Sequence, residues 1–61
     1  MHKGDTYEDL QTGSKVVVVG VSTTTVTVRV SEVAKGEEDL IEGQEFTMQQ
    51  HKFKRYYALS Y

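Results

Sequence analysis

Two runs of β-branched residues dominate the pattern of hydrophobic and polar positions along this chain. The first, Lys15 to Val21, is almost entirely valine, and the second alternates Val26, Val28 and Val30 with polar residues. Alternation with a period of two is typical of a strand that has one buried and one solvent-exposed face. A short Ser/Thr segment separates the runs, so residues 15–30 predict a β-hairpin.

Three further strands and one helical turn are expected around this hairpin. The strands are predicted around Thr6 to Glu8, over Gln44 to Met48 with Phe46 facing inward, and over Tyr56 to Ser60. Thr47 and Gln50 match a capping box, which predicts a helical or 3-10 turn over about Gln49 to Phe53. Five short strands with a turn before the last one predict a small, strongly bent all-β sheet. We expect it to close into a barrel, because closure shields most of the sheet edges.

The chain also contains signals for local irregularity. Gly13 is expected to supply a positive φ in the loop after the first strand. Gly20 is expected to mark a kink or bulge in the first valine run. Beyond Val30 the alternation breaks, because Val33 rather than Glu32 looks like the next inward residue. A β-bulge near Ser31 and Glu32 would restore the phase.

The first valine run is apolar on both faces. If Val17, Val19 and Val21 face inward, then Val16 and Val18 point outward. Two interpretations carry equal weight. Either the strand is central and covered on both sides by its own chain, or the outward pair forms an oligomer interface, most simply a two-fold dimer.

Composition places the chain among small soluble proteins. Its 61 residues contain no cysteine, so residues 1–61 are expected to form a single domain without disulfides. Met1 is followed by polar residues and glycine, so no signal peptide is expected. The longest apolar stretch, Val16 to Val21, is too short to span a bilayer. A cytoplasmic protein without membrane contact is the resulting expectation.

The order Gly4-x-x-Tyr7, Gly13, the valine strands, Phe46 and then Phe53–Tyr57 resembles small Src-homology-3-like barrel proteins over nearly the whole chain. Many members of this group are short phage or bacterial proteins of unassigned function. The resemblance implies a five-stranded Src-homology-3-like barrel of phage or bacterial type. The acidic and aromatic cluster with which other members bind proline-rich peptides is not recognisable here, so that activity is not expected.

A basic and aromatic cluster near the end of the chain is the first candidate binding site. Cations that neutralise phosphates beside aromatic rings that stack on bases would suit a nucleotide or a nucleic acid. The alternative, favoured about two to one, makes Phe53 and Tyr57 core residues and the cations solvated. Seven basic against nine acidic residues, a net charge of −2, is also the wrong sign for a general nucleic-acid binder. The candidate ligand-binding residues are Arg29, His51, Lys52, Lys54, Arg55 and Tyr56.

An acidic segment is the second candidate. It contains Glu37, Glu38, Asp39 and Glu42 and lacks the spacing of a calcium-binding loop. Such a run is usually a solvated hairpin tip, although it could also attract a basic protein surface. Leu40 and Ile41 within it could form an exposed apolar anchor, but the interpretation that we favour is that they fold the loop back onto the barrel.

Catalytic signals are weak. His2 and His51 stand far apart, and no serine occurs in a nucleophile-elbow context. We therefore expect no enzyme, no metal and no cofactor. The leading hypothesis is a non-enzymatic, self-associating module that binds another protein, with inhibition of a host factor as the task that the resemblance implies. The alternatives are nucleotide or nucleic-acid binding, including a nucleotide sponge, and a structural part of a larger assembly.

Overall fold

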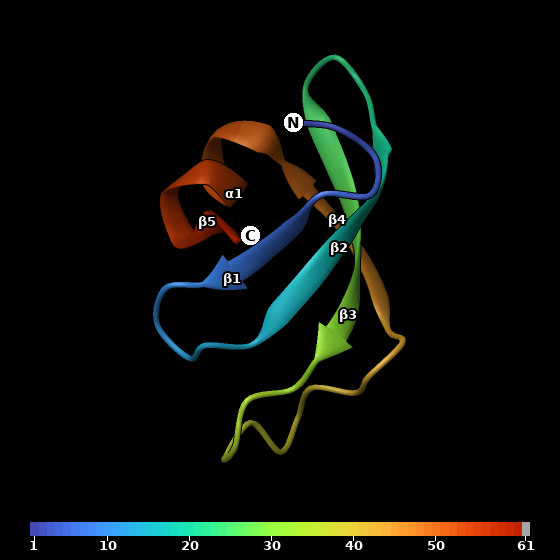
Figure 1. Cartoon of the computed structure of the whole chain (residues 1–61). Helices are drawn as coiled ribbons and strands as arrows, with labels where there is room; N and C mark the ends of the chain where they lie inside the picture. The colour runs from blue at the N-terminus through green and yellow to red at the C-terminus, as the bar shows by residue number, and fades with distance from the viewer. Residues whose placement is uncertain (61) are drawn as a thin grey trace.

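The computed structural model describes residues 1–60 as five antiparallel strands and one helix (Figure 1). The elements are β1 (Thr6–Asp9), β2 (Lys15–Val21), β3 (Thr25–Glu32), β4 (Glu45–Gln49), α1 (Gln50–Tyr56) and β5 (Tyr57–Ser60). The predicted hairpin, the number of strands and the position of the helical segment are confirmed. The helix is longer than the single turn that the capping pattern predicted.

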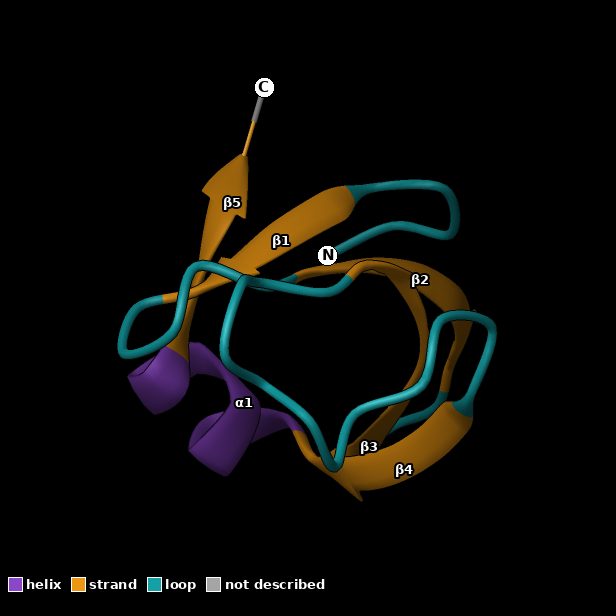
Figure 2. Ribbon diagram, turned by 90° about the horizontal axis from the view of Figure 1, so that it is seen from below, coloured by secondary structure: helices purple, strands orange, loops and turns teal. Residues whose placement is uncertain are grey.

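The strands pair in the order β4–β3–β2–β1–β5. The sheet curls strongly, and α1 lies between its two end strands, β4 and β5 (Figure 2). Within residues 1–60 no hydrogen-bonded ladder joins β4 to β5, so the sheet stays open along this seam. A small, mostly β fold is therefore established, whereas the predicted closure into a barrel is not observed.

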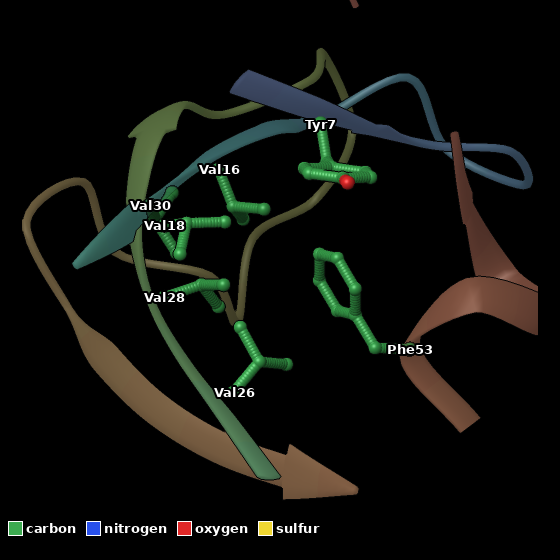
Figure 3. Packing of buried hydrophobic residues seen from close by; sticks show 7 residues of the cluster. All are labelled: Tyr7, Val16, Val18, Val26, Val28, Val30 and Phe53. Atoms are coloured by element: carbon green, nitrogen blue, oxygen red, sulfur yellow. The ribbon is translucent and has the colours of Figure 1, made fainter. Parts of the chain in front are cut away.

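The concave face of the sheet and α1 enclose the core (Figure 3). It is formed by Tyr7, Val16, Val18, Val26, Val28, Val30 and Phe53. The β3 valines point inward as predicted. In β2, however, the inward valines are Val16 and Val18, each only 1% exposed.

The predicted orientation of β2 was therefore wrong. Val16 pairs with Val30 and Val18 with Val28, and residues directly opposite in a ladder share one face. The side chains of Val16 and Val18 are buried in the core of a single chain. They therefore cannot form the predicted oligomer interface. Val21, expected inside, is 44% exposed near the hairpin tip.

Both predicted irregularities of the hairpin are present. Lys15 pairs with Glu32 while Val16 pairs with Val30, so Ser31 is an extra residue in β3. A second extra residue, Val19, lies in β2 just before Gly20. Bulges increase the local twist and bend of a strand, which is how this short sheet curls around its core.

The helix cap was predicted incorrectly. The residue that caps α1 is Gln49, and its side chain makes no capping hydrogen bond to the described residues of the first turn. The Gln50 side chain instead reaches the β2–β3 turn, where its Nε2 donates a hydrogen bond to the carbonyl oxygen of Ser22 at 2.6 Å. Tertiary contact with the hairpin thus replaced the local capping box.

The long β3–β4 loop folds back onto the core. Val33 and Leu40 pack against the core cluster. The buried Ser14 hydroxyl oxygen accepts a hydrogen bond from the Ala34 amide at 2.9 Å, which ties the loop to the β1–β2 connection. The prediction for Leu40 is confirmed. Its neighbour Ile41 is 66% exposed, so the prediction for that residue was wrong.

Candidate interaction surface

Helix α1 is anchored by one buried side chain, Phe53. Its ring meets Tyr7 edge-on at a centroid distance of 4.9 Å and stacks on Tyr57 at 4.5 Å. The core role that the sequence favoured for Phe53 is confirmed, and Tyr57 packs against the same core. With Phe53 in the core and the Gln50 side chain bonded to the β2–β3 turn, the other five side chains of α1 are exposed.

The exposed part of α1 consists of His51, Lys52, Lys54, Arg55 and Tyr56. Residues four apart are neighbours on a helix surface, so Lys52 lies beside Tyr56, and His51 beside Arg55. Lys54 and Arg55 occupy the last turn, where positive charge is favourable to the helix dipole. Within residues 1–60, no carboxylate forms an ion pair with any of the three lysine and arginine side chains of α1.

Leu10 joins this surface from the β1–β2 loop. Its amide donates a hydrogen bond to the carbonyl oxygen of Tyr56 at 2.9 Å. The loop is held by Asp9, whose Oδ1 accepts hydrogen bonds from the amides of Gln11 and Thr12, and by Gly13, which has a φ of +87° as predicted. Leu10 is 65% exposed and Tyr56 is 53% exposed.

We name the set Leu10, Lys52, Lys54, Arg55 and Tyr56 the basic helix patch. Sequence reasoning missed Leu10. The available signal was a single large apolar residue in an otherwise polar loop. Only the hydrogen bond between the loop and the end of α1 brings it to the patch.

Arg29 stands apart from the patch. It belongs to the outer face of the sheet, in register with Val17 and Glu45. Its Nε and Nη2 donate hydrogen bonds to Oε2 of Glu45 at 3.0 and 2.7 Å. The guanidinium is thus already engaged by a carboxylate of its own chain, unlike the cations of α1.

The acidic loop, residues 37–42, exposes Glu38, Asp39 and Glu42 around the apolar Ile41. Over the described part of the chain, none of these carboxylates pairs with a cation. Burial first, and then the charges of Asp9 and Glu37, raise the pKa of the Tyr57 phenol.

The exposed side chains of the basic helix patch and of the acidic loop can contact another molecule at the surface. Residues 1–60 contain no cluster of three or more His, Asp or Glu side chains placed to hold a metal, and they enclose no pocket. None of the helical segments described is long and apolar enough to cross a membrane. Comparison with protein families, with curated proteins and with solved structures finds no match to this chain.

Proposed function

We propose that this protein is a non-enzymatic interaction module that binds an acidic surface of another protein through the basic helix patch. The proposal is carried by the three lysine and arginine side chains of α1, which form no ion pair with any other residue of the described part, residues 1–60. The same patch contains Leu10 and Tyr56, two large exposed side chains with apolar surface. Tyrosine and arginine are enriched where protein partners meet, and a polar rim around an apolar centre is typical of such contacts.

The shape of the patch favours a broad partner over a small ligand. Small molecules and cofactors usually bind in concave sites, whereas the patch lies on the exposed side of a helix. An aromatic ring beside cations would also suit single-stranded nucleic acid. The net charge of −2 opposes general attraction to phosphates, so we make nucleic-acid binding an outcome of the test.

The finer structural assignment belongs to the same proposal. Five strands with a helical segment before the last one support a Src-homology-3-like relationship. A phage or bacterial origin, and a partner that is a host protein inhibited by the contact, are further parts of the proposal. A cytoplasmic location is part of the proposal as well.

Charge reversal on α1 tests the proposal directly. Lys54→Glu with Arg55→Glu should weaken binding of fluorescein-labelled poly-glutamate by about tenfold or more, because two attractive contacts become repulsive. The matched control is Lys3→Glu with Lys35→Glu, which changes the net charge equally at two exposed lysines outside the patch. Fluorescence anisotropy reports both affinities.

The outcomes separate the candidate functions. Loss in the α1 variant alone supports a protein-binding patch. Equal loss in both variants would reduce the effect to net charge and would contradict the proposal. Preference for a labelled single-stranded oligonucleotide over poly-glutamate, lost in the α1 variant, would replace the protein partner with nucleic acid.

A further inference from the structure

We infer that a second copy of this chain covers the basic helix patch. In this arrangement the acidic loop of each copy docks on α1 of the other and closes a two-fold dimer. The inference rests on the proposed function, because the dimer would mask the same surface that binds an acidic partner. The protein would then be regulated by its own concentration, with the acidic loop competing against the partner.

Charge complementarity carries the first step. The basic helix patch holds three cations, and the acidic loop holds Glu37, Glu38, Asp39 and Glu42. In residues 1–60 the ion pairs are His2–Asp5, Lys15–Glu32 and Arg29–Glu45, so neither set is compensated by another residue of that range. A net charge of only −2 opposes the approach of two copies weakly.

The apolar side chains carry the second step. The acidic loop presents Ile41, which is 66% exposed, and the basic helix patch presents Leu10 at 65% and Tyr56 at 53%. Joining the two patches would bury these side chains in a shared apolar centre with opposite charges at its rim. Burial of a large apolar side chain is the main favourable term in association.

The attachment of the loop carries the third step. Leu40 packs on the core, and the amide of Ala34 is bonded to the Ser14 hydroxyl. Ile41 is therefore presented by a loop that is already folded, which reduces the entropy lost on binding. Two complementary patches of one chain can meet reciprocally across a two-fold axis.

A charge-swap experiment tests the dimer. The first variant carries Lys54→Glu and Arg55→Glu on α1, and the second carries Glu38→Lys and Asp39→Lys on the acidic loop. All four side chains are exposed, so both variants should keep the wild-type circular dichroism spectrum. Sedimentation equilibrium should give wild-type protein twice the chain mass, falling toward the chain mass as salt rises from about 0.1 M to about 1 M, where the Debye length shrinks from ~10 Å to ~3 Å.

Each variant alone should have the mass of a single chain, because α1 of the first variant repels the acidic loop and the loop of the second variant no longer carries a net negative charge. An equimolar mixture should regain twice the chain mass, since both contacts then join opposite charges. Wild-type protein at the chain mass under all conditions, variants that still dimerise, or a mixture that stays dissociated would each overturn the inference.

Poly-glutamate binding distinguishes failure of the dimer inference from failure of the proposed function. The loop variant keeps an intact basic helix patch without a competitor, so it should bind poly-glutamate at least as tightly as the wild type. A monomeric wild type that still binds poly-glutamate through α1 would remove the dimer and leave the proposed function. A dimer whose loop variant ignores poly-glutamate would support self-association and remove the proposed function.

Discussion

At the residue scale, neighbouring valines of β2 occupy opposite environments. Val18 is 1% exposed and faces Val28 across the ladder, whereas Val17 lies on the outer face beside Arg29. A sheet contributes alternate side chains to its two faces, so a change at one position disturbs the core and the same change next to it does not.

This difference predicts that Val18→Lys unfolds the protein. A buried unpaired ammonium is destabilising by several kcal/mol, and a domain of this length has only about 3 to 9 kcal/mol of stability. Val17→Lys is the matched control and should remain folded with a similar circular dichroism spectrum. A folded Val18→Lys protein would show that this side chain faces solvent and would restore the discarded interface.

At the element scale, a buried hydroxyl helps to hold the β3–β4 loop, together with the packing of Val33 and Leu40 on the core. Ser14 is 1% exposed, and its Oγ accepts the hydrogen bond of the Ala34 amide. Removing one partner of a buried hydrogen bond leaves the other unsatisfied. The loop that presents Ile41 is therefore held by a contact between residues twenty positions apart.

We expect Ser14→Ala to lower the free energy of unfolding by about 1 to 3 kcal/mol and to accelerate hydrogen exchange at the Ala34 amide. Ser31→Ala, at an exposed bulge position, should change stability by less than about 0.5 kcal/mol. Urea denaturation and amide exchange measure both variants. Unchanged protection of the Ala34 amide in Ser14→Ala would show that this hydroxyl does not hold the loop.

At the scale of the whole molecule, an aromatic stack bridges the open seam of the sheet. Tyr7 from β1, Phe53 from α1 and Tyr57 from β5 contact one another in series. The helix thereby connects the end of β4 to the β1–β5 side of the sheet without a closing ladder. The stack places a phenol where burial and nearby carboxylates disfavour its ionisation.

Stability should therefore fall at alkaline pH. The raised pKa of Tyr57 means that its contribution is fully present below the ordinary value of 10.0 and is lost as pH rises through the higher value of the folded state. Tyr57→Phe keeps the stacked ring without the titrating group, so it should lose less stability between about pH 8 and about pH 11. Urea denaturation of both proteins at the two pH values measures the difference, and equal losses would contradict it.

The strand positions, the β3 valines and the Ser31 bulge were predictable because they follow from local pattern and from the alternation of side chains in a strand. The orientation of β2 was not predictable, because valine occupies both faces of the strand and the sequence pattern does not show which face is buried. The capping of α1 also escaped prediction, because Gln50 found partners in a distant turn.

The candidate interaction surface was also predictable only in part. The cations of α1 and the carboxylates of residues 37–42 were visible as runs of like charge. The sequence did not show which of these charged side chains form ion pairs within the chain. Ion pairs can join residues that are remote in the chain, as Arg29 and Glu45 are. Leu10 reaches Tyr56 through a backbone hydrogen bond between the β1–β2 loop and the end of α1. Local order in this protein is thus a property of neighbouring residues, whereas the composition of its surface depends on which distant segments fold together.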